Sequence, residues 1–260
     1  MQDFWGVAAR VVPAFVLALS GGAVSVLFAV SHRRLCRMIS FAAGTLLGVT
    51  LFAIVPECAA SLPAAGLLAA LGSGYAVFFL VSRYVCHVCP ACAASHFDEA
   101  AAHRFAGIAA GMILALGLHS TMDGLALALG HEAGASAGLD ASMFLAVCVH
   151  KVPEGLALGA LLLAAGCPKA ATLAWVAAVE ATTLLGGAVG LWIAPGISGP
   201  WFDFLMAHVG GGFLFLAVHA VVGELGKHGK KPVLLFFGLG LGLIALLSLL
   251  VGGHHPHGTP

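Results

Sequence analysis

The chain has 260 residues, of which 61% are hydrophobic and 8% are charged, with a formal net charge of zero and a mean hydropathy of +1.06. A soluble domain carries about 25% charged residues, so this composition excludes a soluble enzyme, a secreted disulfide-bonded domain and a disordered chain. Neutral charge without a basic cluster argues against a nucleic-acid partner. A protein that crosses the lipid bilayer several times remains.

Eight apolar stretches follow one another along the chain, and each has the roughly 20 residues that a helix needs to cross a bilayer. The apolar runs are continuous, which excludes the alternating pattern of a β-barrel. We therefore predict an all-α integral membrane protein, whose single transmembrane domain covers residues 1–260. The expected spans are 10–31, 38–58, 65–83, 104–130, 141–165, 169–194, 201–222 and 232–252.

The basic residues predict the orientation of these spans, because Lys and Arg collect in cytoplasmic connections. The connections after spans two, four and six carry none. Those after spans one, three, five and seven carry or adjoin most of them, namely Arg33, Arg34, Arg37, Arg83, Arg104, Lys169, Lys227, Lys230 and Lys231. We therefore expect odd-numbered connections in the cytoplasm and both termini outside. The two remaining basic residues are Arg10, at the head of span one, and Lys151, inside span five.

Short sequences recur in different spans. Span four contains His-x-x-x-acid-Gly-Leu-Ala-Leu at residues 119–127, and span five repeats it at 150–158. Spans one and six share Gly-Gly-Ala-Val, at 21–24 and 186–189, and spans two and seven each end in a Glu thirteen residues after a Gly. Paired spans run in opposite directions under the predicted orientation, so we predict an inverted repeat of 3+2+3 spans. In transporters of this design the substrate site lies at the repeat interface.

Ionisable side chains cluster at mid-membrane depth, where they are costly and usually functional. His119 and Asp123 are four residues apart on span four, and His150 and Glu154 repeat this spacing on span five. Each pair therefore shares one face of its helix. Two imidazoles and two carboxylates are able to surround one divalent cation. Pro153 lies between the span-five pair and is expected to loosen the helix there.

Two further ionisable residues lie at similar depth. Glu180 is about eleven residues into span six, and Lys151 is about ten residues into span five, roughly 15 Å deep at 1.5 Å per residue. A lysine at this depth is expected to face the bundle interior and to pair with an acid. Glu180 and Asp123 are the candidate partners.

The segments HSTMDG, at 119–124, and HKVPEG, at 150–155, resemble the paired signatures of the ZIP family of divalent metal transporters. Eight spans, outside termini and a metal-rich connection between spans three and four extend the resemblance over nearly the whole chain. It implies that the main metal ligands are His119, Asp123, His150 and Glu154. It also implies transport of Zn²⁺ or a similar ion toward the cytoplasm, by a bundle that slides against a fixed scaffold.

The same resemblance implies that Ser120, Lys151 and Glu180 surround the position of a second metal in binuclear members. This chain departs from those members at Lys151, where they carry an acid. A fixed ammonium repels a second cation strongly at low dielectric. We therefore expect one metal in the central site rather than two.

The connection at residues 84–103, which we expect in the cytoplasm, is rich in soft metal ligands. Thiols stay reduced there, so metal binding is favoured over disulfides. The candidate ligands are Cys86, His87, Cys89, Cys92, His96 and His103. The tail carries three more histidines, and their metal binding is left open: His254, His255 and His257.

Carboxylates at the ends of two spans are candidate mouths of a cation pathway. Glu57 ends span two on the outer side and Glu224 ends span seven on the inner side, while His208 and His219 lie along span seven. Carboxylates in these places attract cations. A charge that simply ends a helix in the interfacial zone has the same pattern.

Two other functions stay open. An exporter of the diffusion-facilitator type also uses His-x-x-x-Asp pairs, but that class typically has six spans and a cytoplasmic C-terminal domain. An intramembrane metal hydrolase needs an activated water beside a general base, and its H-E-x-x-H motif is absent from the sequence. We therefore expect a transporter rather than an enzyme, with no organic cofactor and with Zn²⁺, Fe²⁺, Mn²⁺ or Cd²⁺ as substrate. The expected location is the plasma membrane, or the inner membrane of a bacterium, and a homodimer is left open.

Overall fold

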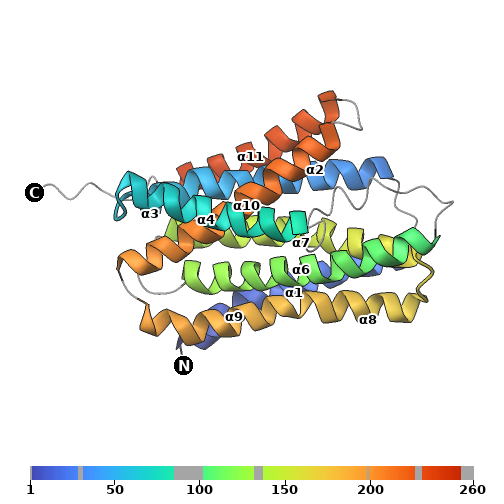
Figure 1. Cartoon of the computed structure of the whole chain (residues 1–260). Coiled ribbons are helices and arrows are strands. Elements are labelled where there is room, and N and C mark those ends of the chain that lie inside the picture. Colours follow the sequence, from blue (N-terminus) through green and yellow to red (C-terminus); the bar gives the residue numbers. More distant parts are fainter. Residues whose placement is uncertain are drawn as a thin grey trace, which may run out of the picture.

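The computed structural model describes residues 2–28, 32–84, 102–131, 137–197, 199–225 and 230–252 (Figure 1). Long helices dominate these ranges. In chain order the elements are α1 (Gln2–Leu27), α2 (His32–Val49), η1 (Thr50–Ile54), α3 (Val55–Ala59), α4 (Ala64–Tyr84), α6 (Ala102–His131), α7 (Ala137–Ala164), α8 (Lys169–Glu180), α9 (Thr182–Ile193), η2 (Ala194–Gly196), α10 (Pro200–Leu225) and α11 (Lys230–Gly252).

Eight helical segments of the described chain are long and apolar enough to cross a membrane, which confirms the predicted spans. They are Phe4–Leu27, Cys36–Ala59, Ala64–Tyr84, Ile113–His131, Gly138–Leu163, Lys169–Ile193, Pro200–Gly223 and Lys230–Leu250. The described part of the chain is therefore all-helical, with the spans of a multi-pass membrane protein.

The first helix begins earlier than the sequence predicted. The expected span started at residue 10, but α1 starts at Gln2, so Arg10 lies in its third turn and not at its head. The apolar residues before Arg10 continue the helix, and Val7 among them is buried. Arg10 is tolerated inside the helix because its guanidinium forms a bidentate ion pair with Asp140 at the start of α7.

Two of the spans are irregular near their middle. The second span passes from α2 through a π-helical turn, η1, into the short helix α3. The sixth is divided at Ala181, which separates α8 from α9 directly after Glu180. Such interruptions are common at functional sites. Span five behaves differently, because α7 continues across Pro153 and is not broken there.

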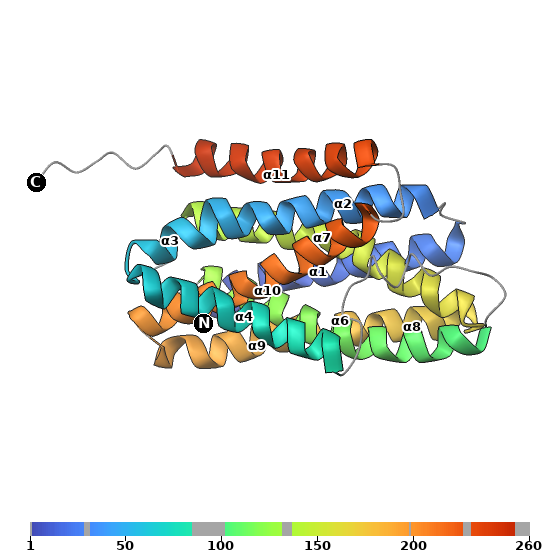
Figure 2. The same cartoon turned by 45° about the horizontal axis from the view of Figure 1, so that its top comes forward.

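The spans pack into two groups, which Figures 1 and 2 show side by side. In the first group, α1 packs along α7, and α6 packs along α9 and α7. In the second, α2 packs along α11, and α10 packs along α4 and α2. The main contact between the groups joins α7 to α2 and α11. We call the first group the α6–α7 bundle and the second the α2–α10 bundle.

Within each bundle, glycines bring two pairs of helices into backbone contact. A Cβ atom on any of these glycines would overlap a carbonyl oxygen of the facing helix, so only glycine permits the approach. In the α6–α7 bundle the contacts are Gly21 on Val152 and Gly155 on Ala18, then Gly186 on Thr121 and Gly124 on Thr183. In the α2–α10 bundle they are Gly44 on Phe237 and Gly240 on Phe41, then Gly211 on Leu71 and Gly74 on His208.

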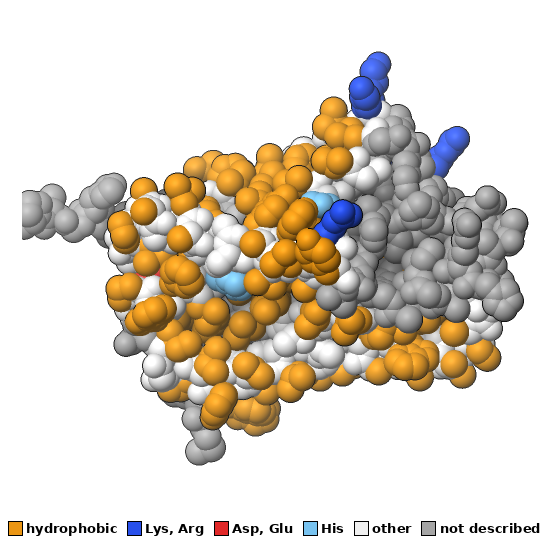
Figure 3. All heavy atoms as spheres, in the orientation of Figure 1, with side chains coloured by type: hydrophobic (Ala, Val, Ile, Leu, Met, Phe, Trp, Pro, Cys, Tyr) orange, Lys and Arg blue, Asp and Glu red, His pale blue; other side chains and the backbone are white. Residues whose placement is uncertain are grey.

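The two ends of the molecule differ in charge. At one end, which we call the basic end, the described Lys and Arg side chains are exposed: Arg33, Arg34, Arg37, Arg83, Lys169, Lys230 and Lys231. Figure 3 shows Lys and Arg gathered where α2 and α11 begin, while hydrophobic side chains cover most of the remaining described surface of that face. The opposite end carries the exposed aromatic residues Trp5, Trp192 and Trp201. Tryptophan is enriched where a protein meets the membrane–water interface.

Candidate metal centre

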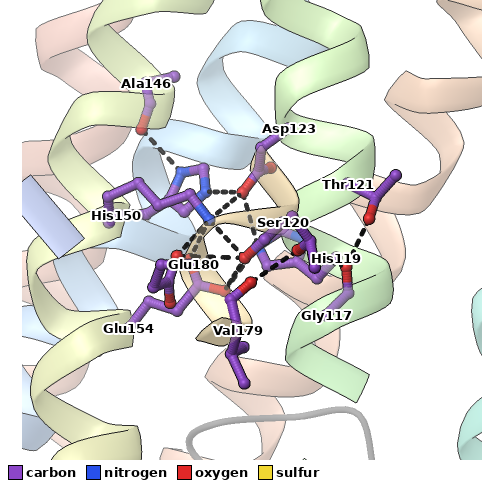
Figure 4. Close-up of polar contacts among 12 residues, drawn as sticks. Gly117, His119, Ser120, Thr121, Asp123, Ala146, His150, Glu154, Val179 and Glu180 are labelled. Carbon is purple, nitrogen blue, oxygen red and sulfur yellow. Dashed lines mark hydrogen bonds and ion pairs between the residues drawn. The ribbon is translucent and has the colours of Figure 1, made fainter. Parts of the chain in front are cut away.

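Four of the predicted site residues converge between α6 and α7. His119 and Asp123 lie one turn apart on α6, and His150 and Glu154 lie one turn apart on α7, so the two packed helices face each other with both pairs (Figure 4). One ligand atom of each residue lies within 4.8 Å of the others. All four side chains are at most 4% exposed.

The distances between these atoms describe a compact cluster. His119 Nε2 lies 3.5 Å from Asp123 Oδ2 and 3.8 Å from Glu154 Oε1. His150 Nε2 lies 3.1 Å from the same Asp123 oxygen. The two imidazole rings are neighbours, with centres 5.3 Å apart. Asp123 Oδ2 is thus the atom that both histidines share.

Some polar atoms of the cluster residues have no hydrogen-bond partner in the described part of the chain. His150 Nδ1 donates to the Ala146 carbonyl oxygen of its own helix at 2.8 Å, so Nε2 is the nitrogen that could bind a cation in the neutral ring. Asp123 Oδ1 and His119 Nδ1 are buried and have no hydrogen-bond partner in the described part of the chain. Buried polar atoms normally have partners. A cation bound among these groups would be a bonding partner for Nε2 and for the carboxylates.

Lys151 lies next to this cluster and is completely buried. Its ammonium is 2.8 Å from Asp123 Oδ2 and 3.0 Å from Glu180 Oε2, which confirms the two expected partners. A third acid joins them, since Nζ is also 2.8 Å from Glu154 Oε2. The Ser120 hydroxyl, at 2.7 Å, completes the contacts. One ammonium therefore forms ion pairs with three carboxylates.

Glu180 and Ser120 complete the polar centre. Glu180 is the last residue of α8, immediately before the break at Ala181. The Ser120 hydroxyl lies 3.2 Å from Glu180 Oε2 and 3.4 Å from Glu154 Oε1. Because spans four, five and six each contribute, the three side chains predicted around a second metal position do lie together. The Lys151 ammonium bonds both Ser120 and Glu180.

A hollow adjoins the cluster on the side of the basic end. Its polar lining comes from His119, His150 and Glu154, and its apolar wall from both bundles: Ile39, Ala42, Ala43 and Leu46 of α2, Pro153 of α7, and Leu216 and Ala220 of α10. The opposite side is filled by large apolar side chains that are at most 3% exposed, namely Leu127, Met143, Val147, Met206 and Val209. Among the described residues, the hollow therefore lies on the side of the basic end, and apolar side chains lie on the other side.

The α2–α10 bundle contributes one aromatic residue to the site that sequence reasoning missed. Phe213 of α10 is 1% exposed and stands edge-on to His150, with ring centres 6.4 Å apart. Phe215, two residues further on, packs instead against Tyr75 and Phe78 of α4. No sequence signal distinguished the two phenylalanines, because only the crossing of α7 and α10 decides which of them meets His150.

The predicted pathway residues lie apart from one another. His208 Nδ1 is 2.8 Å from the Ser73 hydroxyl of α4. His219 Nδ1 is 3.2 Å from the Phe215 carbonyl oxygen, and its ring is stacked on that of Phe215. Glu57 is half-buried in α3, toward the end opposite the basic end. Glu224 belongs to α10, but its side chain lies outside the described part, so the two mouths stay predictions.

The structure does not describe the predicted loop ligands. Cys86, His87, Cys89, Cys92 and His96 lie outside the described residues. His103 is within α6, with its side chain outside the described part, and the three tail histidines also lie outside it. Metal binding by the loop therefore stays a prediction.

A polar clasp at the end opposite the basic end was also missed. Asp140 accepts the Arg10 guanidinium, and His131 Nδ1 of α6 lies 3.4 Å from Asp140 Oδ2. The clasp joins α1, α6 and α7. Arg10 itself was the available signal, because a charged residue inside an apolar span requires a partner.

These features define a class of protein: a multi-pass helical membrane protein with a buried cluster of histidines and carboxylates suited to a cation. A family model described as ZIP zinc transporter matches residues 85–250, which is more than half of the chain. The chain belongs to the ZIP zinc transporter family, and the resemblance of its two signatures is thereby confirmed. A comparison with curated proteins gives no match. Members of the family transport divalent metals.

Proposed function

We propose that this chain carries Zn²⁺ across the membrane toward the cytoplasm, with His119, Asp123, His150 and Glu154 as the ligands of the transported ion. The observation that carries the proposal is the spacing of their buried atoms, which is 3.1, 3.5 and 3.8 Å for three of the pairs. Around a tetrahedral Zn²⁺ with bonds of about 2.0–2.1 Å, neighbouring ligand atoms lie about 3.3–3.4 Å apart. Small movements of the side chains would close the cluster on one ion.

The ligand set favours Zn²⁺ over the other candidates. Two imidazole nitrogens and two carboxylate oxygens form a four-coordinate set typical of Zn²⁺. Mn²⁺ prefers more oxygen ligands in octahedral geometry, and Lys151 fills the polar space beside the cluster that further ligands would need. Fe²⁺ and Cd²⁺ are the competitors with the most similar demands.

The charge asymmetry supports an orientation in the membrane on which the proposed direction depends. We assign the basic end to the cytoplasm, because Lys and Arg collect on that side, and this assignment puts the start of α1 and the end of α11 outside. The hollow beside the cluster lies toward the basic end. This hollow would give the ion a route to the cytoplasm, and the proposed import direction rests on the resemblance to the family.

We also propose an inverted repeat within one transmembrane domain, residues 1–260, which would support alternating access. The glycine contacts come in corresponding pairs: Gly21 meets the third residue of HKV in α7, and Gly186 meets the third residue of HST in α6. The contacts of Gly44 and Gly211 correspond in the same way. We propose that the α6–α7 bundle, which holds the site, slides against the α2–α10 bundle. Transporters with inverted repeats commonly work by such rigid-body motion.

The alternative functions have weaker support. Membership of a transporter family argues against a hydrolase, and four protein ligands leave little room for the activated water that metal-dependent hydrolysis needs. A diffusion-facilitator exporter is disfavoured by the eight spans and by the same family membership. The organic cofactors used by many enzymes have no role in this proposal. Location in the plasma or inner membrane also belongs to the proposal, and a dimer is not required.

Uptake of radioactive Zn²⁺ into proteoliposomes tests the function, with Fe²⁺, Mn²⁺ and Cd²⁺ as competing ions. Asp123→Ala and Glu154→Ala should each lower the initial rate by at least about 100-fold, beyond the 10–100-fold typical of residues that only support a metal ligand. Asp203→Ala is the matched control, because Asp203 is an acid of α10 that bonds Ser61 away from the site. Near wild-type uptake by both site variants would remove the ion from this position.

A further inference from the structure

Lys151 is bonded to the same carboxylates that are proposed to hold the ion. Asp123 Oδ2 lies 2.8 Å from Lys151 Nζ, and this same oxygen is the one shared by the two histidines. Glu154 divides its oxygens, with Oε2 on Lys151 and Oε1 toward His119. The ammonium and a bound Zn²⁺ would thus compete directly for Asp123 and would share Glu154.

The lysine also has two partners that the ion does not need. Ser120 Oγ lies 2.7 Å from Nζ, and Glu180 Oε2 lies 3.0 Å from it. When an ion takes Asp123 Oδ2, the ammonium can keep these two bonds and the one to Glu154 Oε2. Lys151 therefore does not have to leave the site for the ion to bind.

The formal charge of the site differs between the loaded and the empty state. Three buried carboxylates and one ammonium leave a formal charge of −2, which one divalent cation neutralises. After the ion leaves, Asp123, Glu154 and Glu180 all still accept a bond from Lys151. Without the lysine, three buried carboxylates would remain without a cation in the empty site, which is very unfavourable.

We propose that Lys151 is a tethered counter-cation, which takes the place of the substrate in the empty site and so allows the unloaded transporter to return. This inference rests on the proposed function. A carrier completes net uptake only if the empty site crosses back, whereas exchange of external for internal ion needs only the loaded site to move. Lys151 should therefore matter for net uptake and much less for exchange.

The experiment compares the two fluxes in proteoliposomes with radioactive Zn²⁺ outside. Net uptake is measured into empty vesicles, and exchange into vesicles filled with non-radioactive Zn²⁺. Lys151→Met should slow net uptake at least about tenfold, equivalent to about 1.4 kcal/mol in the barrier, while exchange changes less than about threefold. The same variant in detergent should bind Zn²⁺ more tightly, since the competing ammonium is gone. Lys169→Met, at an exposed lysine of α8, is the matched control and should change neither flux.

Two further measurements separate the explanations. Lys151→Met combined with Glu180→Gln has the same formal site charge as the wild type, yet Asp123 and Glu154 still lack their cation. Net uptake should stay slow in the double variant; recovery would mean that net charge alone matters and would overturn the tethered role.

The wild type gives a test that does not depend on the folding of any variant. Its net uptake and exchange should agree within about threefold, because the return step is not limiting.

Several results would overturn the inference. These are an equal loss of both fluxes in Lys151→Met, weaker Zn²⁺ binding by that variant, or wild-type exchange that exceeds net uptake tenfold or more. Absence of both fluxes in the wild type would instead contradict the transport function itself, and the inference with it. The two failures are therefore distinguishable.

Discussion

Phe213 and His150 stand edge-to-face with ring centres 6.4 Å apart, although they belong to different bundles. His150 is held from its own helix by the Ala146 carbonyl, and from the α2–α10 bundle by Phe213. The contact therefore links the orientation of a proposed ligand to the relative position of the two bundles. It has to change if one bundle slides against the other.

Phe213→Leu should raise the KM for Zn²⁺ uptake by about twofold to tenfold, because an edge-to-face aromatic contact contributes about 0.5–1.5 kcal/mol beyond its buried area. Phe78→Leu is the control, since Phe78 is a buried phenylalanine of α4 whose ring packs on Phe215 and not on a histidine of the site. Thermal stability of both variants is measured in parallel. Equal KM values for the two variants would show that Phe213 does not orient His150.

The second prediction concerns the number of bound ions. The Lys151 ammonium lies 2.7–3.0 Å from Ser120 and Glu180, where it occupies the space of a second cation and repels one. Crystals of the wild type soaked in Zn²⁺ should show one anomalous peak between α6, α7 and α8 at the zinc edge. Lys151→Asp should add a second peak, at some cost in stability. Two fully occupied peaks in the wild type would contradict this prediction.

The third prediction concerns the loop at residues 84–103. Replacing Cys86, Cys89 and Cys92 with Ser should lower the number of metal ions bound per purified chain, because thiolates are the soft ligands there. Transport should be largely retained, since loop ligands can concentrate ions without forming the obligatory route. Elemental analysis and proteoliposome uptake give the two readouts. Complete loss of transport by folded protein would place the loop in the pathway.

The fourth prediction concerns the glycine contacts. A Cβ atom at Gly21 would overlap the Val152 carbonyl oxygen, which is backbone and cannot rotate away. Gly21→Ala should therefore destabilise the protein by about 1–3 kcal/mol, the usual cost of overpacking. Gly72→Ala is the control, because nothing lies within 4 Å of its added methyl group.

The proposed repeat adds a condition to this experiment. Gly186→Ala should lower the melting temperature in detergent by about as much as Gly21→Ala, since Gly186 meets Thr121 as Gly21 meets Val152. Unequal losses, with one variant as stable as Gly72→Ala, would argue against equivalent helix crossings in the two halves.

The spans and the four proposed ligands could be predicted from the sequence because both signals are local. Hydropathy over about 20 residues identifies a span without reference to its neighbours. The four-residue spacing of His119 to Asp123, and of His150 to Glu154, assigns each pair to one helix face. The burial depth of Lys151 likewise predicted an acidic partner, and two of its three acids were anticipated.

Other features depended on how the helices cross, and only the tertiary structure decided them. The contact of Phe213 with His150 and the clasp of Arg10 with Asp140 each join residues from different helices. The break after Glu180 also has no strong local signal, whereas the π-helical turn at Thr50–Ile54 lies just before Pro56, which lacks an N–H for the helix. Hydropathy and spacing determine which residues form a span and which side chains share one face of its helix. Close packing at small residues determines which faces meet, and therefore that a buried lysine shares its carboxylates with the proposed metal site.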